Sequence, residues 1–294
     1  MTEDSLHAAR DRPAVRAYRL AYDGRPFHGF QRQPDVPTVE SALLDALDAL
    51  DLRPSGDSDA ATRATPSGYA AAGRTDAGVS ALEQTVAFEA PAWLTPRALN
   101  VELPPAVRAW ASADLPAAFH ATHEAAWRGY RYFLYAPAPD AADARDLLAR
   151  FEGDADLHNL TATAGGDTVR TIREATAHRS GPFLVVDVRA DGFLHESVRR
   201  LVRYVDRRLA PAATTPPPER VLSDERLDGP EGVGPAPPEP LVLRRVHYES
   251  VTFETDDEAL ADRQSVFGER RRRAAARERV LKAVAEPRDE SPER

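Results

Sequence analysis

The sequence predicts an α+β protein built from two similar halves. Segments patterned as strands alternate with segments patterned as helices in both halves of the 294 residues. A chain of this length can bury one large core or two small ones. No repeat is visible residue by residue, so the duplication rests on the order of the elements. We divide the chain into a loose N-terminus (1–14), an N-terminal half (15–116), a C-terminal half (117–254) and a charged helical tail (255–294).

The N-terminal half opens with a strand and a helix. Residues 17–21 are mostly apolar and lead into the turn dipeptide Asp23-Gly24, which is typical of a strand end. Apolar side chains then recur at helical spacing from Val39 to Leu50, behind a start signal at Thr38. After a polar loop (52–67), the sequence predicts a short buried strand (69–72), a second strand (85–90) and a short helix (95–101).

The C-terminal half repeats strands and helices and leads into the tail. Its first strand, 126–136, places Tyr130 and Tyr132 on the face opposite Arg131. The next predicted elements are a helix (141–151), two strands joined by a turn at 180–182 (169–178 and 183–190), an arginine-rich helix (195–209) and a last strand (242–253).

Two segments outside these elements have distinctive compositions. Residues 211–240 are crowded with proline and glycine, which predicts a mobile or extended connector. Residues 256–285 predict a charged helix with four consecutive arginines at 270–273. Such a run is most often a solvated face, although contact with RNA is the alternative. The last nine residues predict disorder.

Composition excludes several classes of protein. There is no cysteine, which rules out disulfides, thiolate chemistry and cysteine-based zinc sites. No stretch approaches the roughly 18 apolar residues of a membrane span. The acidic start Met1-Thr2-Glu3-Asp4 lacks the basic and apolar regions of a signal peptide. We therefore expect a soluble cytoplasmic protein with no membrane association.

The charge distribution is unusual for a protein that binds nucleic acid. The net charge is −9, whereas such proteins are usually basic, and Lys282 is the only lysine. An acidic surface with almost no lysine fits a salt-rich cytoplasm, and a high-GC genome explains the same composition. In molar salt the Debye length falls to about 3 Å, so RNA recognition would rest on direct contacts such as Arg–phosphate pairs and base stacking.

The segment 72–81, Ala-Gly-Arg-Thr-Asp-Ala-Gly-Val-Ser-Ala, carries the most chemical information. Asp76 could act as a nucleophile or a general base, and Arg74 is the natural group to keep it ionised. Gly78 would supply a backbone angle that other residues adopt only at a cost. An ordinary Asp-Ala-Gly turn with a surface ion pair is the alternative interpretation of these few residues.

From Gly73 onward this segment resembles the signature of the tRNA pseudouridine synthase A family, except that Ser80 stands where that family has His. Further blocks resemble the family in the same order, from about residue 18 to residue 243. These blocks are 22–33 (Tyr-Asp-Gly-Arg-Pro-Phe-His-Gly-Phe-Gln-Arg-Gln), 38–40, 119–121 (Phe-His-Ala), 128–132 (Arg-Gly-Tyr-Arg-Tyr), 170–172, 192–194, 198–199, and 236–237 with Leu241. A haloarchaeal member of the family fits the composition as well.

The resemblance implies a fold and an activity. The fold is two ferredoxin-like halves, related by a pseudo-two-fold axis, that share one mostly antiparallel mixed sheet with helices on one face. The activity is isomerisation of uridine to pseudouridine in the anticodon stem-loop of tRNA, at nucleotides 38 to 40. The family needs no cofactor and no metal, and it works as a homodimer with one RNA held across both subunits.

The resemblance also assigns roles to individual residues. Asp76 is the implied nucleophile, Arg74 its electrostatic partner and a group that helps to unstack the target base. Tyr130 is the implied active-site tyrosine, with a half-buried strand tyrosine as the alternative. Arg199 is expected to pair with Asp76 from the other half, with phosphate contact or a helix-surface ion pair as the alternatives. Leu241 is expected beside the base, although core packing would explain it equally well.

A second group of residues is expected to contact the RNA. Gln31, Arg32 and Gln33 are placed on a loop at the substrate, where a satisfied turn is the alternative. His120 and Arg131 lie in the matched blocks, with a structural hydrogen bond the simpler role for His120. Metal ligands are poorly supported, because His120 and His123 have no evident third partner and His195-Glu196 lacks a second histidine one turn away.

Several departures from the family pattern leave room for other functions. Ser197 stands where the family has Met, Val202-Arg203 where it has Val-Gly, and Pro240 where it has Gly. A catalytically inactive tRNA-binding or RNA-folding module is therefore one alternative. A nucleoside hydrolase is another, and it would require a second acid across the sugar, for which the sequence offers no strong candidate.

Overall fold

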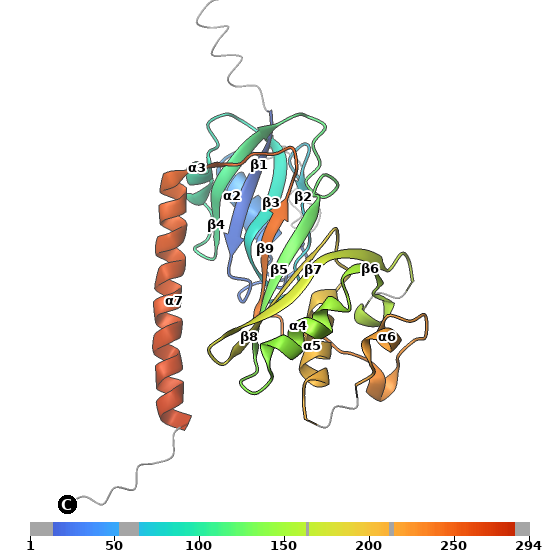
Figure 1. Ribbon diagram of the computed structural model, residues 1–294. Helices are drawn as coiled ribbons and strands as arrows, with labels where there is room; N and C mark the ends of the chain where they lie inside the picture. Colours follow the sequence, from blue (N-terminus) through green and yellow to red (C-terminus); the bar gives the residue numbers. More distant parts are fainter. Residues whose placement is uncertain (1–13, 53–64, 163–164, 212–214, 286–294) are drawn as a thin grey trace, which may run out of the picture.

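The computed structural model describes residues 14–52, 65–162, 165–211 and 215–285. Outside these ranges lie 1–13 of the predicted N-terminus, 53–64 of the predicted polar loop, 212–214 of the predicted connector and 286–294, the nine residues predicted to be disordered. One ten-stranded sheet runs through the molecule in the order β10-β4-β1-β3-β9-β5-β8-β7-β6, and β2 pairs with β3 (Figure 1). The strands are β1 (Ala14–Tyr22), β2 (Ala70–Ala71), β3 (Ser80–Ala90), β4 (Val107–Leu115), β5 (Trp127–Tyr135), β6 (Gly153–Asp156), β7 (Val169–Ser180), β8 (Phe183–Ala190), β9 (Leu241–His247) and β10 (Glu254–Thr255).

The strand pairing divides the sheet at a seam. Every pairing is antiparallel except that of β3 with β9, which are parallel through Ser80↔Val242 and Ala81↔Leu243. Strands from the N-terminal half lie on one side of this junction, and β5, β6, β7 and β8 lie on the other, beyond β9. The expected single, mostly antiparallel mixed sheet is therefore confirmed.

The helices pack mainly on one face of the sheet. They are α2 (Val39–Ala49), α3 (Pro96–Asn100), α4 (Ala141–Ala149), α5 (Ser197–Arg208), α6 (Pro218–Val221) and α7 (Asp257–Ala285), with 3-10 turns at His158–Leu160 and Gly229–Glu231. Helix α2 buries its apolar face in the N-terminal core, while α4 and α5 pack into a second core beneath the C-terminal strands. Tyr130 contacts both cores and so joins them at the seam.

Helix α2 forms where the sequence predicts it. Thr38 caps its first turn, because the Thr38 side chain accepts from the Ser41 N–H and the Ser41 hydroxyl accepts from the Thr38 N–H in return. Val39, Leu43 and Leu47 lie on the buried face, as their spacing requires.

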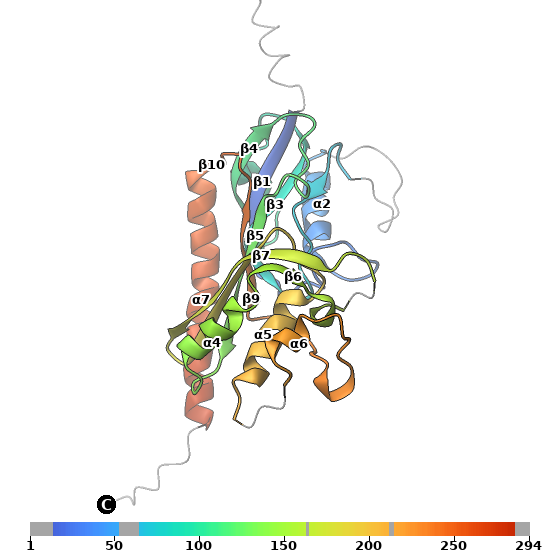
Figure 2. The same cartoon turned by 45° about the vertical axis from the view of Figure 1, so that its right-hand side comes forward.

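Helix α7 lies on the other side of the sheet (Figure 2). On β4, Val107 and Ala109 belong to the N-terminal core, and the alternating Arg108 and Trp110 contact α7 instead. Arg108 pairs with Asp262 at 2.7 Å, and the guanidinium of Arg263 lies 4.6 Å from the centre of the Trp110 ring. The charged tail is thus helical as predicted, and its first half is docked on the N-terminal half.

The connector prediction was wrong for residues 215–240. This part of the chain contains α6 and buries Val221, Leu227, Val233 and Ala236 in the C-terminal core. Its apolar residues are spaced between the prolines, so that each can reach the core while the prolines restrict the backbone. The segment is therefore packed against α5 and supplies carbonyl groups near the cleft described below.

Three strands were not predicted from the sequence, β4, β6 and the two-residue β10. Strand β4 is rich in alanine, which has little intrinsic preference for strands, so its conformation is set by pairing with β1. Strand β6 has four residues and pairs with β7. Among the described residues, no helix has both the length and the apolar composition needed to cross a membrane.

Candidate active site

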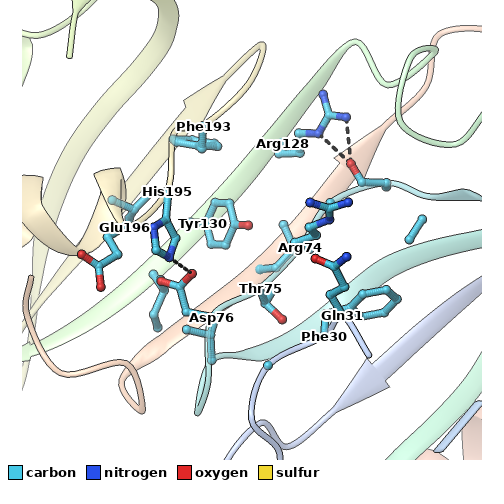
Figure 3. A pocket seen from close by; sticks show the side chains of 18 of the residues that line it. Phe30, Gln31, Arg74, Thr75, Asp76, Arg128, Tyr130, Phe193, His195 and Glu196 are labelled. Carbon is cyan, nitrogen blue, oxygen red and sulfur yellow. Dashed lines mark hydrogen bonds and ion pairs between the residues drawn. The ribbon is translucent and has the colours of Figure 1, made fainter. Parts of the chain in front are cut away.

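A cleft of about 1230 Å³ opens at the seam between the two halves. Its walls come from the loop before β3, the loop after β1, strand β5 and the first turns of α5 (Figure 3). Because β3 and β9 run parallel here, the loop that carries Asp76 lies at the seam, facing α5 from the other half. Each half therefore contributes one wall.

The Asp76 loop is held by close backbone contacts. The Phe30 N–H donates to the Thr75 carbonyl at 3.0 Å, and the Thr75 hydroxyl forms a buried hydrogen bond with the Tyr22 hydroxyl at 2.8 Å. Gly29 has φ +99°, and a Cβ there would lie 2.9 Å from the Thr75 carbonyl oxygen. Gly78 also has a positive φ, +81°, as predicted. The Asp76 loop is thus held in place by close steric contacts and buried hydrogen bonds.

Ser80 has a structural role at the position where it departs from the family signature. Its hydroxyl accepts a hydrogen bond from the Gly24 N–H at 3.0 Å. This contact ties the start of β3 to the turn after β1.

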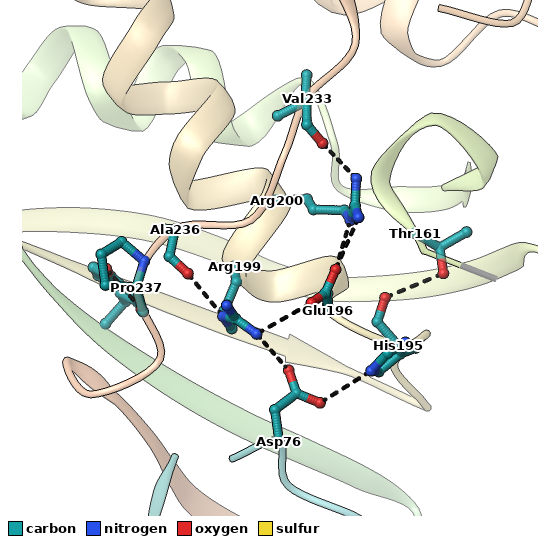
Figure 4. A network of polar contacts seen from close by, with 10 residues as sticks. Asp76, Thr161, His195, Glu196, Arg199, Arg200, Val233, Ala236 and Pro237 are labelled. Carbon is teal, nitrogen blue, oxygen red and sulfur yellow. Dashed lines mark hydrogen bonds and ion pairs between the residues drawn. The ribbon is translucent and has the colours of Figure 1, made fainter. Parts of the chain in front are cut away.

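The Asp76 carboxylate is one-fifth exposed and has two partners in the other half, a guanidinium and an imidazole (Figure 4). Arg199 donates to one carboxylate oxygen at 3.0 Å, and the Nε2 atom of His195 lies 3.5 Å from the other. The predicted pair between Asp76 and Arg199 is confirmed. The expectation that Arg74 pairs with Asp76 was wrong, because the Arg74 side chain is exposed and points toward Gln31, away from the carboxylate.

Arg199 is oriented by further contacts at the start of α5. Its Nε donates to the Ala236 carbonyl at 2.8 Å, and its Nη1 lies 3.4 Å from Glu196. Glu196 also pairs with Arg200 at 2.8 Å, and Arg200 donates to the Val233 carbonyl at 2.6 Å. The guanidinium groups of Arg199 and Arg200 thus both pair with the Glu196 carboxylate, which lies beside Asp76.

Glu196 adopts a left-handed backbone conformation with φ +61°. This conformation is uncommon for a residue other than glycine and costs of order 1–3 kcal/mol. It also explains why α5 begins at Ser197, two residues later than predicted, since Glu196 precedes the first helical residue.

Tyr130 and Phe193 form an aromatic wall of the cleft. Their rings pack edge to face with centroids 5.0 Å apart. Burial raises the pKa of the Tyr130 hydroxyl well above its usual value, and the negative charge of Asp76 raises it further. Tyr130 is therefore a neutral phenol at physiological pH, beside the carboxylate, and the aromatic wall offers a surface for a planar ring.

Arg128 also lines the cleft, although no role was predicted for it from the sequence. Within the part of the chain that the structure describes, its guanidinium donates only to backbone carbonyls, including that of Ala72 at 2.9 Å and that of Asp191 at 2.8 Å. Its place in the matched block before Tyr130 was visible in the sequence, but its hydrogen-bond partners come from distant segments.

The predicted RNA-contacting residues divide into two groups. Gln31, Gln33 and Leu241 line the cleft, whereas Arg32, His120 and Arg131 are not among its lining residues. Arg32 lies beside Gln31 and gives its backbone N–H to Glu40 at 2.7 Å.

His120 and Arg131 lie outside this cleft, so their contact with RNA stays a prediction. His120 is exposed, packs against the tilted ring of His123 and accepts a hydrogen bond from the Thr122 N–H. Arg131 alternates with Tyr130 along β5 and therefore points to the opposite face, where it forms a bidentate pair with Asp187 at 2.8 and 2.9 Å.

The structure also groups three possible metal ligands that the sequence analysis did not bring together. One oxygen or nitrogen atom each from Asp76, His195 and Glu196 lies within 4.8 Å of the other two. Both carboxylates in this group form ion pairs with guanidinium groups, through Arg199 and Arg200. The arrangement is that of an ion-paired cluster, so we assign it no metal.

Comparisons with known proteins identify the family. A family model described as tRNA pseudouridine synthase matches residues 147–249. The tRNA pseudouridine synthase A of Natronomonas pharaonis is 52% identical over 279 residues, which cover 93% of this chain and 100% of the relative. That of Haloarcula marismortui is 50% identical over 285 residues (92% and 99%), and that of Methanocella arvoryzae 37% over 249 residues (83% and 88%).

These relatives define the class as tRNA-modifying enzymes. The chain belongs to the tRNA pseudouridine synthase A family. The resemblance stated from the sequence motifs is thereby confirmed, and the two relatives near 50% identity are haloarchaeal.

Proposed function

We propose that this protein isomerises uridine to pseudouridine in tRNA, with Asp76 as the reacting carboxylate. The observation that carries the proposal is the ion pair between Asp76 and Arg199 across the seam, in a cleft large enough for a nucleotide. A carboxylate held by a guanidinium and still partly exposed is suited to stabilise or trap an electron-poor sugar.

The reaction is balanced without an external reagent. The bond between C1′ and N1 of the uracil breaks, the base turns, and a bond forms between C1′ and C5. The proton on C5 is lost and N1 gains one, so no oxidant, reductant or co-substrate is consumed. Asp76 can act by attack on C1′, by addition to uracil C6 or by removal of the C2′ proton, and its position beside Tyr130 serves each route.

The cleft walls support an extruded base. Moving a nucleotide out of its stack costs a few kcal/mol, which contacts in the pocket must offset. Tyr130 and Phe193 supply an aromatic surface for the uracil, and Leu241 lies at the apolar floor. Arg74 and Gln31 are exposed at the mouth, where we place contacts to the RNA backbone and to the gap left by the base.

The substrate and the assembly follow from the family. We propose that the target lies in the anticodon stem-loop at nucleotides 38 to 40, and that two copies of the chain hold one tRNA in the cytoplasm. Four arginines line the cleft, Arg74, Arg128, Arg170 and Arg199, in a chain whose net charge is −9. Arg128 is engaged by carbonyl groups and Arg199 by Asp76, so we propose that Arg74 and Arg170 hold phosphate at high salt through short-range contacts.

The departures in α5 leave the proposed chemistry in place. Ser197 is buried, and Arg203 lies 3.4 Å from Asp206 one turn further along the same helix. The neighbouring Arg199 still reaches Asp76 at 3.0 Å. This geometry disfavours the inactive binding module. A nucleoside hydrolase would need a free second acid, and Glu196, the acid beside Asp76, forms ion pairs with Arg199 and Arg200.

The experiment that tests the proposal is carbodiimide-based mapping of pseudouridine. Unmodified tRNA with uridine at nucleotide 39 is incubated with the purified protein in molar salt, without added cofactor. We expect a pseudouridine in the anticodon arm and no free uracil. Binding of several tRNAs with no modification would support the inactive module, and release of uracil would support the hydrolase.

A further inference from the structure

Arg128 is bound entirely by backbone carbonyl groups. Its Nε and Nη2 donate to the Ala72 carbonyl at 3.3 and 2.9 Å, and Nη2 also donates to that of Thr122 at 2.6 Å. Its Nη1 donates to the carbonyls of Ala125 and Asp191 at 3.3 and 2.8 Å. All three guanidinium nitrogens are therefore engaged, and none of them donates a hydrogen bond to a side chain of the described residues.

These carbonyls belong to the two walls of the cleft. Ala72 follows β2 in the N-terminal half and precedes Asp76 by four residues. Asp191 follows β8 in the C-terminal half and leads through Phe193 into α5, which carries Arg199. One planar group on β5 thus joins the segments that deliver the reacting carboxylate and its partner (Figure 3).

A neighbouring hydroxyl reinforces this junction. The Thr122 hydroxyl donates to the Ala71 carbonyl at 2.6 Å, so that Arg128 and Thr122 together hold two consecutive carbonyls before the Asp76 loop.

Electrostatics alone does not explain the placement of Arg128. Among the described residues it forms no ion pair with a carboxylate, whereas Arg199, Arg200 and Arg131 each form at least one. Burial disfavours its charged form and lowers its pKa. Arg128 therefore acts here through the fixed geometry of its five N–H donors, which the ammonium group of a lysine cannot reproduce.

We propose that Arg128 is a positioning residue that sets the distance between Asp76 and Arg199 by holding the carbonyls of Ala72 and Asp191 together. It acts through the backbone of the two walls and takes no part in bond making. This inference rests on the proposed function, because its main readout is pseudouridine formation.

The test compares Arg128→Gln and Arg128→Lys with Arg108→Gln as a matched control. Arg108 is also buried and donates to three carbonyls, those of Leu103, Pro104 and Val107, but it lies on β4 under α7, away from the cleft. Single-turnover rates, tRNA affinity and melting temperature are measured for each variant. If Arg128→Gln does not fold, Arg128→Lys, which keeps the charge, carries the comparison.

We expect both Arg128 variants to lose rate on the order of 10²-fold, since a small misplacement of reacting groups has an effect of that size. Their tRNA affinity should change by less than about threefold. Arg108→Gln should lower the melting temperature and keep the wild-type rate. A wild-type rate in Arg128→Lys would overturn the proposal, because charge would then suffice. Equal rate losses in Arg128→Gln and Arg108→Gln would overturn it as well.

Amide hydrogen exchange separates this inference from the proposed function. Exchange at residues 72–79 should become faster in both Arg128 variants and stay unchanged in Arg108→Gln, whether or not the protein modifies tRNA. Unchanged exchange in the Arg128 variants would contradict the positioning role. A wild-type protein that modifies no tRNA would instead contradict the proposed function.

Discussion

The two halves of the molecule hold their parts of the site by different physical means. The N-terminal half holds the Asp76 loop by shape, through a positive φ at Gly29, a backbone hydrogen bond to Thr75 and a buried hydroxyl pair. The C-terminal half holds Arg199 by charge and carbonyl contacts, through Glu196 and Ala236. The reacting carboxylate lies in the sterically fixed wall, and the wall that faces it is held electrostatically.

This difference indicates what each wall can tolerate. A loop that is held by steric contacts is expected to be displaced by larger side chains, because protein interiors are close-packed and the backbone cannot easily move. A wall held by ion pairs is expected to be weakened by the loss of a charged partner and by screening by salt. Partly buried pairs are screened less than exposed ones. Substitutions can therefore test each wall separately.

The largest effect in this comparison is expected at Gly29. Its φ is +99°, and the new Cβ in Gly29→Ala would lie 2.9 Å from the Thr75 carbonyl oxygen. We expect a loss of about 1–3 kcal/mol in the free energy of unfolding and a rate reduced by at least about 10²-fold. Gly73→Ala is the control, because a Cβ there meets nothing within 4 Å. Equal behaviour of the two variants in melting and single-turnover assays would refute steric fixing of the loop.

A smaller effect is expected from Arg199→Lys. The ammonium can still pair with Asp76, but it cannot also reach the Ala236 carbonyl and Glu196 in the same geometry. Loss of one charge-assisted hydrogen bond is worth about 1.5–3 kcal/mol, which corresponds to a rate lowered by about 10- to 10²-fold. Single-turnover kinetics would check this, and a wild-type rate would show that the second and third contacts of Arg199 are dispensable.

A pH effect is expected where α7 docks on the N-terminal half. Burial opposes ionisation of Asp23, but hydrogen bonds from Arg25 and Arg270 outweigh it and lower the pKa of this carboxyl below its usual value. The resulting stabilisation is present above the unfolded pKa of about 4 and is lost as the pH falls through the lower, folded value. We expect Trp110 fluorescence, in a variant whose other tryptophans are Phe, to report undocking only below about pH 4.

The matched variant for this effect is Asp23→Asn. It should lower stability at neutral pH by less than about 1 kcal/mol and remove the acid-dependent change. A wild-type acid transition in Asp23→Asn would assign the change to another group.

The smallest effect is expected in the outer half of α7. Residues 271–285 are exposed along their length, so deletion of 271–294 should change neither rate nor melting temperature. Deletion of 256–294 uncovers Arg108 and Trp110 and should lower the melting temperature, while the chemistry stays intact. A folded but inactive truncation at either position would show that the tail takes part in the reaction.

The sequence predicted those features that depend on local pattern. The Thr38 cap, the apolar spacing of α2 and the β7–β8 hairpin are short-range features and were placed correctly. The Asp76 loop and its pairing with Arg199 followed from the family resemblance, since 123 positions separate the two residues.

Features that depend on the meeting of distant segments could not be predicted. Arg74 lies two residues from Asp76 yet points away from it, toward Gln31. Arg128 binds carbonyls of segments up to 63 positions away, and backbone carbonyls leave no trace in a sequence. The alanine-rich β4 forms because β1 pairs with it, and its composition does not reveal that partner.

The most direct test of the account is the Asp76→Asn variant in the pseudouridine mapping assay, beside a tRNA-binding measurement. The change removes the charge and keeps the shape of a side chain in the sterically fixed wall. The account predicts that the pseudouridine made by the wild-type protein disappears, while the affinity for tRNA and the melting temperature stay close to wild type. Continued modification by Asp76→Asn would contradict the central role of this carboxylate, and joint loss of binding and turnover would make the residue structural.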